Sequence, residues 1–382
     1  MSTITVNNTA SFLQAIQFAK AGDTILLGPG TYTPITLRDA NFTAPVTIAS
    51  ADPSQPAVLT GLTVSSSSGL VFSGLSFSTA AATGNFPFSV NGSANISLTN
   101  VNVYGNDTQE FAATITGLLI RGCQNVSVTG SRFHKLMIGI CQVNNVGLLI
   151  SNNIFHDLHC RGIDGGGSNN VVISYNTIHD IFPTPGGLHS DGIQFWTNAS
   201  NPAGANIQII GNNIYRGDGL MFQGIFVRAD PTGAHPFTNM TIQGNNLTGL
   251  DYNGIAVGGV SGLTVSQNVV ASYSDRTSEL VVDSCTNVSV TSNRASLFKF
   301  WSLLGFTQSG NLGLAAVTNL NTDAAPTLTQ NNATAPIVHA FAITMSGLGS
   351  TATATTTAAA PIAASVRAHL ALPTLATGHP LA

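Results

Sequence analysis

The sequence has few charged residues and no cluster of basic ones. Asp, Glu, Lys and Arg together make up 7% of its 382 residues, against roughly 25% in an average soluble protein. Its twelve lysines and arginines form no run or patch, so nucleic acid is excluded as an expected partner. Hydrophobic residues reach 43% and the net charge is only −4, which is not the composition of a disordered chain. A folded chain with small polar turns is therefore expected.

Cysteines, long apolar runs and a secretory signal are also scarce or missing. The four cysteines are too few and too scattered for a disulfide scaffold, so we expect buried thiols at Cys123, Cys141, Cys160 and Cys285. No run of 18 apolar residues is present, so we expect no membrane span. The first residues lack a basic region followed by an apolar core. No signal peptide is therefore recognisable, and the extracellular or virion-associated location that we expect would need a signal-free export route, release by lysis, or assembly into a virus particle.

One asparagine recurs in a repeated phrase, between an alternating strand and an apolar pair. Each copy lies three residues after an apolar residue, and successive copies are 23, 36, 33, 23 and 25 residues apart. The six copies in register are Asn153, Asn176, Asn212, Asn245, Asn268 and Asn293. Self-similarity at a period of roughly 20 to 50 residues is typical of solenoids. Stacked amides bond to one another and to turn backbone, so we expect an asparagine ladder.

A second repeated phrase predicts how the coils pair. A glycine followed by an apolar residue opens a short strand, as in Gly139–Gln142, Gly162–Asp164 and Gly192–Phe195, with an irregular last copy at Ser302–Gly305. Strands repeated once per coil pair in parallel, about 4.8 Å apart. The sequence therefore predicts an all-β fold, a right-handed parallel β-helix (solenoid) of about ten or eleven coils over residues 24–320.

The two ends of the chain differ from the coils. Residues 1–23 are predicted to form an N-terminal cap, because Phe12–Ala19 has apolar residues at helical spacing after a run of capping residues. A terminal helix covers the apolar end and the open strand edge of a solenoid. Residues 321–382 are predicted to form a C-terminal cap around Ile337–Ile343, followed by a low-complexity Ala/Thr/Pro tail.

Flat rings occur in a second register. The rings, each three residues beyond the ladder asparagine or its equivalent, are Tyr104, His134, His156, His179 and Tyr215. We expect them to stack along the axis. Asp157 and Asp180 directly follow two of the histidines. Because successive coils repeat this pattern, we assign these His-Asp pairs to the scaffold rather than to catalysis.

The few charged residues gather on the outward side of the second strands. The residue after the glycine points inward, so the next residue and the one two further on point outward. The residue before the glycine lies where the chain bends, two positions after His159 in one coil and His189 in another. In the coils around the longest loops these positions hold Arg121, Arg161, Asp164, Asp191, Gln194, Trp196, Gln223, Arg228 and Asn253. A plain surface pair of Arg161 and Asp191 is the alternative, but loops on a rigid scaffold favour function.

Some segments resemble a known family. Gly22–Tyr32, with the sequence GDTILLGPGTY, resembles the first coil of the pectin-lyase-like β-helix proteins, which include alginate lyases, mannuronan epimerases and phage tailspike depolymerases. Gly162–Val171 and His189–Ile193 are similar to coils of the alginate lyase and epimerase branch. In that branch a tyrosine precedes the Gly-Phe-Asp strand and Pro-His-Glu follows its aspartate. Asp164 matches the aspartate, whereas Arg161 replaces the tyrosine and glycines replace Pro-His-Glu, so the resemblance leaves the base unassigned.

The residues and the resemblance together predict a carbohydrate-active enzyme, a polysaccharide lyase that cleaves an acidic or decorated glycan by β-elimination. In this reaction a base removes the proton α to a carboxyl group while a cation neutralises the developing enolate charge. Arg161 or Arg228 would neutralise that charge, and His159 or His189 would act as base or acid. Contacts to the polysaccharide are expected from Arg121, Gln194, Trp196, Gln223 and Asn253.

Asp164 and Asp191 would orient these groups or hold a metal. The calcium-dependent pectate lyases use several carboxylates for the ion, and only these two are placed on one surface here, so calcium is left open and no other cofactor is expected. A glycoside hydrolase that uses the two aspartates as its carboxylate pair is the first alternative. A glycan-binding phage spike or surface adhesin without catalysis is the second, with a homotrimer expected in the viral case.

Overall fold

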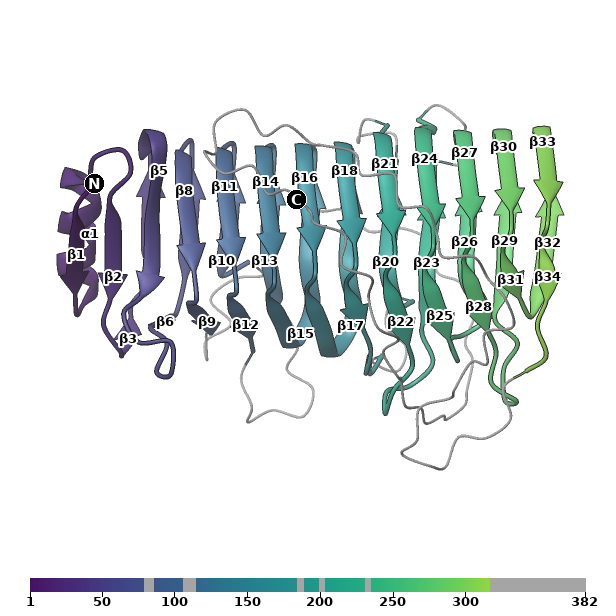
Figure 1. Ribbon diagram of the computed structural model, residues 1–382, viewed down its shortest axis with the longest axis horizontal. Helices are drawn as coiled ribbons and strands as arrows, with labels where there is room; N and C mark the ends of the chain where they lie inside the picture. Colours follow the sequence, from purple (N-terminus) through teal and green to yellow (C-terminus); the bar gives the residue numbers. More distant parts are fainter. Residues whose placement is uncertain (79–85, 106–114, 184–188, 199–202, 231–234, 317–382) are drawn as a thin grey trace.

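The chain folds as one long stack of coils. The computed structural model describes residues 1–78, 86–105, 115–183, 189–198, 203–230 and 235–316. Figure 1 shows the strands side by side along one axis, with helix α1 (Thr9–Phe18) at one end and strand β33 (Leu304–Ser309) at the other. Strands of successive coils pair in parallel. The predicted right-handed parallel β-helix is confirmed.

One face of the stack is a 13-stranded sheet. Side chains along its strands alternate between buried and half-buried positions, as in the buried Val171 and Ile173 on either side of Val172. This period of two directs one set of side chains to the axis and the other to solvent. In spatial order the strands are β1 Thr3–Val6, β2 Thr24–Leu27, β5 Asn41–Ser50, β8 Ser68–Ser73, β11 Ala94–Thr99, β14 Gln124–Thr129, β16 Val146–Ser151, β18 Asn169–Ser174, β21 Ala205–Ile210, β24 Phe237–Gln243, β27 Val260–Ser266, β30 Thr286–Thr291 and β33.

The other two faces share a 21-stranded sheet, because two long strands, β15 (Arg132–Val143) and β17 (Ile154–Gly166), run round the corner between them. Beside these, one face has β3 Thr31–Tyr32, β6 Val58–Leu59, β9 Ser76–Ser78, β12 Asn102–Tyr104, β19 Thr177–Ile178, β22 Asn213–Tyr215, β25 Asn246–Thr248, β28 Val269–Ala271, β31 Arg294–Ala295 and β34 Leu312–Gly313. The last face, called the β20 face below, has β4 Ile35–Arg38, β7 Leu62–Ser65, β10 Phe88–Asn91, β13 Thr116–Arg121, β20 Asp191–Trp196, β23 Gln223–Arg228, β26 Asn253–Gly258, β29 Glu279–Asp283 and β32 Leu297–Trp301. Eleven coils carry a strand on all three faces, and β33 and β34 begin a twelfth.

The N-terminal end is closed by a helix and a strand. Helix α1 begins after Asn8, whose side chain accepts a hydrogen bond from the Ser11 amide at 2.9 Å, as N-cap residues do. The predicted helix is therefore present, with Phe12 and Ile16 buried. Strand β1, which pairs with β2, is not predicted from the sequence because it precedes the first repeat and buries only Val6. Within the described residues, no helix is long and apolar enough to cross a membrane.

At the far end, the last second strand differs from the predicted one. The strand that pairs with β29 is β32, in which Lys299 lies beside Val281. The prediction of Ser302–Gly305 is wrong, because Leu304 already begins β33 in the 13-stranded sheet. Only 18 residues separate Asn293 from Asn311, so this coil is shorter than the others and lacks the glycine that marks the phase. The predicted C-terminal cap and tail, residues 321–382, lie outside the described residues.

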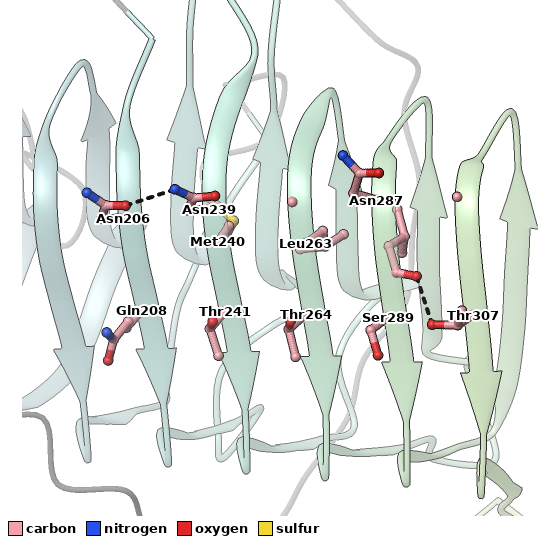
Figure 2. Close-up of a pocket in the computed structure, with 13 residues that line it drawn as sticks. Asn206, Gln208, Asn239, Met240, Thr241, Leu263, Thr264, Asn287, Ser289 and Thr307 are labelled. Atoms are coloured by element: carbon pink, nitrogen blue, oxygen red, sulfur yellow. Dashed lines mark hydrogen bonds between the residues drawn. The ribbon is translucent and has the colours of Figure 1, made fainter.

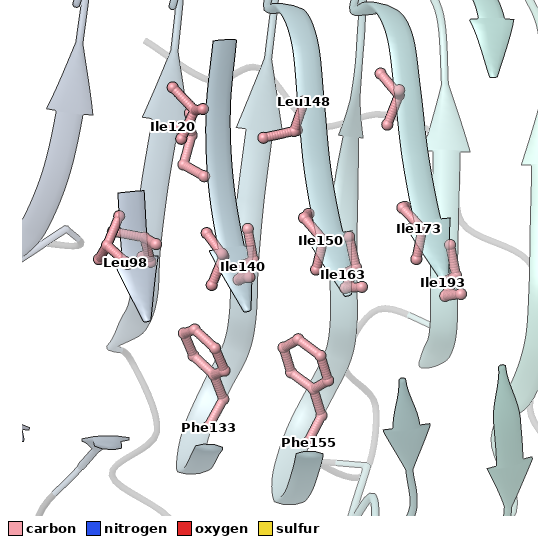
Figure 3. Close-up of a cluster of buried hydrophobic side chains, with 14 of the residues drawn as sticks. Leu98, Ile120, Phe133, Ile140, Leu148, Ile150, Phe155, Ile163, Ile173 and Ile193 are labelled. Atoms are coloured by element: carbon pink, nitrogen blue, oxygen red, sulfur yellow. The ribbon is translucent and has the colours of Figure 1, made fainter. Parts of the chain in front are cut away.

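Aliphatic and phenylalanine side chains fill the axis. Figure 3 shows Ile140, Ile163 and Ile193 in line from successive coils, and all three are 0% exposed. The rings of Phe133 and Phe155 stack with their centroids 4.9 Å apart. Full burial of one such side chain contributes about 1.5–3 kcal/mol. Each coil is therefore held chiefly by apolar contact with its two neighbours.

The recurring asparagines line one turn and bond along the axis. From Asn153 to Asn293, each side-chain amide donates to the Oδ1 of the next at 2.9–3.0 Å. Each Nδ2 also donates to a backbone carbonyl, as Asn176 does to Ile150 at 2.9 Å. Asn311 adds a further member at 3.1 Å. Since a buried unpaired polar group costs about 1–3 kcal/mol, the amides are stable only when the row is continuous.

The five rings stack on an adjacent turn. Successive centroids are 5.3, 5.0, 5.5 and 4.9 Å apart, and neighbouring planes differ by at most 14°. The Nδ1 atoms of His156 and His179 each lie 2.7 Å from the carboxylate of the next residue, Asp157 and Asp180. Burial lowers the pKa of His134 in this stack to about 4. The rings form a scaffold element in which His134 is neutral.

The glycines of the second strands mark where neighbouring coils touch. A Cβ atom on Gly139 would lie 2.7 Å from the carbonyl oxygen of Gly162, and one on Gly162 would lie 2.5 Å from that of Gly192. Real Cβ atoms do not approach so closely, so any side chain would force the coils apart. This close approach is the physical reason for the repeated glycine.

Candidate functional site

Strand register brings the charged residues of two coils together on the β20 face. Arg161 of β17 is in register with Asp191 of β20, and Asp164 is in register with Gln194. Adjacent coils are about 4.8 Å apart, so these four side chains meet across one pair of strands. The predicted groove walls beside them fall partly outside the described residues, which lack 184–188 and 199–202 here.

Arg161 lies between two carboxylates. Its Nη1 is 3.4 Å from Asp164 Oδ2, and its Nε is 3.5 Å from Asp191 Oδ2. Its Nη2 donates to the backbone carbonyl of His189 at 3.4 Å. Burial by itself would lower the pKa of Arg161, but the two nearby carboxylates outweigh that effect and raise it. The guanidinium is therefore charged and holds both acids together.

Asp191 in turn orients His189. The Asp191 side chain is 0% exposed, and its Oδ2 lies 2.9 Å from Nδ1 of His189, whose side chain is 36% exposed. The imidazole packs edge-on against Phe226, with ring centroids 5.0 Å apart. The Gln194 amide nitrogen lies 3.4 Å from Nε2. Asp191, Phe226 and Gln194 therefore hold the imidazole in one position at the surface.

Asp164 is held from the other side by Trp196. The indole Nε1 of the half-buried Trp196 donates to Asp164 Oδ1 at 3.0 Å. Burial raises the pKa of Asp164 above its ordinary range, although Arg161 and the indole bond oppose the shift. Cys141 lies in register beside Asp164, and burial raises the pKa of its thiol to about 12. A thiol in that state is protonated and provides no nucleophile.

Arg228 lies on the same face, one coil beyond Trp196. Its side chain is 52% exposed, and Nη1 is 2.6 Å from Asp283 Oδ2, two coils away. Gly258 lies between the two, and a Cβ atom there would meet the guanidinium. Arg228 and Phe226 are two residues apart on β23 and point to the same side of the strand. Arg228 therefore lies about 6.6 Å along the strand from Phe226, which His189 contacts.

The remaining predicted residues lie around this cluster. Asn253 Nδ2 donates to Gln223 Oε1 at 2.8 Å, and Gln223 is in register with Asp191. His159 is half-buried, with Nδ1 3.3 Å from the Phe182 carbonyl oxygen. Arg121 is exposed at the end of β13, three coils and therefore about 14 Å from the coil of Trp196. The exposed side chains among the predicted site residues are therefore separated along the β20 face by buried ones.

Most of the cluster is closed rather than an open floor. Exposure is 7% for Arg161, 5% for Asp164, 0% for Asp191 and 6% for Gln194. The alternation of side chains along a strand predicts that these four point outward, but it does not predict that they are buried. Because the guanidinium of Arg161 occupies the space between the two carboxylates, the pair does not fit a calcium ion. Across the described ranges, no group of three or more His, Cys, Asp or Glu residues is arranged to hold a metal.

Two partners are missed by the sequence reasoning. Phe226 and Asp283 lie in the outward columns, but nothing in the repeat assigns Phe226 to His189 or Asp283 to Arg228. The second contact has a pattern that could have been used. Arg228, Gly258 and Asp283 follow one another in one register, and a long cation can cross a glycine to reach the next carboxylate.

Comparison with known proteins bears on the fold. The family model described as "Right handed beta helix region" matches residues 47–214. Among solved structures, the Dettilon tailspike protein is similar at 12% identity over 79% of this chain and 62% of its own, with a TM-score of 0.57. A lacto-N-biosidase from Eubacterium ramulus is similar at 12% identity over 82% and 68%, with a TM-score of 0.53. PfbA, a surface adhesin of Streptococcus pneumoniae, is similar at 11% identity over 79% and 88%, with a TM-score of 0.50.

A comparison with curated protein sequences gives no match. At the identities above, likeness to solved structures establishes the fold alone. The matched segment 47–214 contains the whole Arg161, Asp164, Asp191 and His189 cluster. Together with the parallel register of the described coils, it shows that the chain has the right-handed parallel β-helix fold.

Proposed function

We propose that this protein is a carbohydrate-active enzyme that cleaves a polysaccharide at the β20 face, with His189 as its acid/base residue. The observation that carries the proposal is the contrast within one ion pair: Asp191 is completely buried, and the His189 ring that it orients is exposed. Only 7% of the residues in this chain are charged. Four buried ionisable or amide side chains around one exposed imidazole therefore favour a functional site over simple packing. The fold itself suits enzymes and adhesins alike, so the proposal depends on the site.

The reaction we favour is β-elimination on an acidic or decorated glycan. His189 Nε2 would remove the proton α to the sugar carboxyl group, which is general-base chemistry worth about 10²- to 10⁴-fold in rate. Arg228, half exposed on the neighbouring strand, would neutralise the carboxylate. Arg161 is already engaged by Asp164 and Asp191, so its role is to hold Asp191 in place. The proposed reaction does not use a calcium ion.

A glycoside hydrolase on the same scaffold is the second candidate. The raised pKa of Asp164 is what a general acid needs. Hydrolysis also requires a second carboxylate facing the sugar, and Asp191 has no exposed surface. We therefore rank it below elimination.

The test is incubation with a panel of bacterial and algal polysaccharides, followed by mass and ultraviolet absorbance of the products. Elimination leaves an unsaturated, absorbing sugar at the new end, whereas hydrolysis leaves none. Binding without shorter chains would select a glycan-binding spike or adhesin instead. His189→Ala should abolish cleavage with the fold retained, and undiminished turnover in that variant would refute the site.

We further propose that such an enzyme acts outside the cell or on a virion, where its polymer lies. A homotrimer is proposed for the virion case. Sedimentation of the full chain would show the oligomeric state, and a monomer would remove that part of the proposal.

A further inference from the structure

A hollow without charge lies on the 13-stranded sheet, away from the Arg161 cluster. It spans β21, β24, β27, β30 and β33 (Figure 2), and we call it the β27 hollow. Its volume is ≈ 560 Å³, within the range of about 300–1,000 Å³ typical of ligand sites. Of the thirteen described residues that line it, none is charged or aromatic. Its surface groups are chiefly amides and hydroxyls.

One rim of the hollow is a column of residues with left-handed backbone. Asn206, Asn239 and Asn287 have φ of 56°, 54° and 52°, and Gly262 has φ of 77° at the equivalent position of β27. Only asparagine and glycine adopt this conformation readily. The Asn239 amide donates to Asn206 Oδ1 at 3.2 Å. Asn206 donates in the same way to Asn170 at 2.9 Å.

This outer amide row stops at Gly262, which has no side chain. Asn239 Oδ1 and the whole Asn287 amide have no hydrogen-bond partner in the described part of the chain, and both residues are exposed. They face each other across one coil, about 9.6 Å apart by strand spacing. Thr241, Thr264 and Ser289 lie below them, half-buried, with hydroxyls that likewise have no such partner among described residues. The gap is a notch with free donors and acceptors on three sides.

A second interruption of the same asparagine row, at Gly147, provides a comparison for the one at Gly262. Gly147, with φ of 74°, breaks the column between Asn125 and Asn170. The outward residues below that break are Ser127, Leu149 and Val172, and the one hydroxyl among them, on Ser127, is already bonded to Ser97 at 2.8 Å. Gly147 does not line the β27 hollow. The break at Gly262 therefore differs from the one at Gly147 in having unpaired hydroxyls below its unpaired amides.

We propose that the β27 hollow is a second carbohydrate site, which binds a neutral glycan chain and performs no cleavage. Amides present a donor and an acceptor side by side, and hydroxyls do both, which matches the hydroxyl groups of a sugar. A lining without Lys, Arg or His has nothing to pair with a uronate carboxylate. The five strands extend the hollow over about 19 Å along the axis, so it takes an extended chain. This site does not depend on His189 being catalytic.

The test is affinity electrophoresis of the full chain through gels that contain dextran, galactomannan or hydroxyethyl cellulose, with alginate as an acidic comparison. At least one neutral polymer should retard the protein, equally at low and high salt, because no ion pair contributes. Gly262→Asn should weaken that retardation at least tenfold. Asparagine accepts this φ, and its Cβ would lie 3.0 Å from the mobile end of Asn239, so the row closes over the notch.

Gly147→Asn is the matched control, since it makes the same change in the same row outside the hollow. It should bind neutral polymers as the unchanged protein does. Absence of retardation by every neutral polymer would overturn the proposal, as would equal retardation of Gly262→Asn or equal loss in Gly147→Asn. His189→Ala separates this site from the proposed enzyme, because it should lose cleavage and keep neutral-polymer binding.

Discussion

The molecule contains His-Asp pairs of two kinds. In the ring stack, His156 and His179 lie 2.7 Å from Asp157 and Asp180, and the two pairs are copies of each other in adjacent coils. On the β20 face, His189 lies 2.9 Å from Asp191, and the neighbouring coils have no copy. The contact is nearly the same in both places. What differs is repetition and, for the His156–Asp157 pair, which partner is buried; His179 and Asp180 are about equally exposed, at 20% and 19%.

In the stack, the histidine is the more buried partner of His156–Asp157, at 11% against 42% exposure. On the β20 face the order is reversed, with the carboxylate at 0% and the imidazole at 36%. A buried histidine with an outer carboxylate suits packing, whereas a buried carboxylate with an outer imidazole suits chemistry on an external molecule. In a repeat protein, a pair that departs from the repeat is therefore the better candidate for function.

The largest effect should come from removing one imidazole from each kind of pair. His189→Ala should lower the cleavage rate by about 10²- to 10⁴-fold, the usual contribution of a positioned base, while His156→Ala should leave it nearly unchanged. Thermal unfolding should show the reverse, with His156→Ala the less stable of the two. Equal loss of rate in both variants would remove the distinction.

The second largest effect concerns the cation that holds Asp191. Arg161→Met leaves two buried carboxylates without a counter-charge and should cost about 3–5 kcal/mol in unfolding free energy. Arg228→Met breaks a pair whose cation is half exposed and should cost about 1 kcal/mol or less. Denaturant unfolding of both variants measures the difference. Similar small losses would mean that Arg161 is screened by water and does not hold the cluster together.

The two asparagine rows provide a third comparison. Asn212→Ala in the buried row leaves the Asn176 amide without its acceptor at 2.9 Å, which should cost about 1–3 kcal/mol. Asn206→Gly in the exposed outer row keeps a residue that adopts the left-handed φ of 56° without strain and leaves its neighbours open to water, so it should change stability by about 0.5 kcal/mol or less. Denaturant midpoints at unchanged slope would measure both.

The smallest effect is a dependence on pH that belongs to the stack. Burial lowers the pKa of His134 to about 4 from 6.5, so the unfolded chain binds this proton more readily than the folded one. The stabilising contribution is complete above pH 6.5 and decreases as the pH falls toward 4. His134→Tyr keeps a ring in the stack without that titration, so its melting temperature should fall less over this range. An identical slope in both proteins would contradict the assignment.

The fold was largely predictable because its physical causes recur in every coil. The apolar residue, the glycine and the asparagine each have one physical role in the coil. Because each recurs in many coils, a single sequence shows the pattern many times. The misplaced last strand at Ser302–Gly305 occurs where the coil shortens and the glycine is missing. The outer asparagine row also follows a sequence pattern, because each of its members directly precedes an inward apolar residue, as Asn95, Asn125, Asn206 and Asn239 do.

The site was predictable only in part. Register follows from the repeat, so the proximity of Arg161 and Asp191 could be expected. Burial of Asp164, the edge-on contact of His189 with Phe226, and the reach of Arg228 to Asp283 depend on side-chain rotamers and loop cover. Each of these occurs once among the residues that the structure describes, and a feature without copies leaves no periodic pattern in the sequence.

The glycine contacts between coils have a consequence for how such a chain changes length. Because Gly139, Gly162 and Gly192 meet their neighbours backbone to backbone, segments that run from one glycine to the next begin alike and are interchangeable units. Deleting residues 139–161 would join Ile138 to Gly162 with the same kind of junction. The protein can therefore be shortened or lengthened by whole coils, in steps of about 4.8 Å. Residues added inside a coil have to project sideways as a loop.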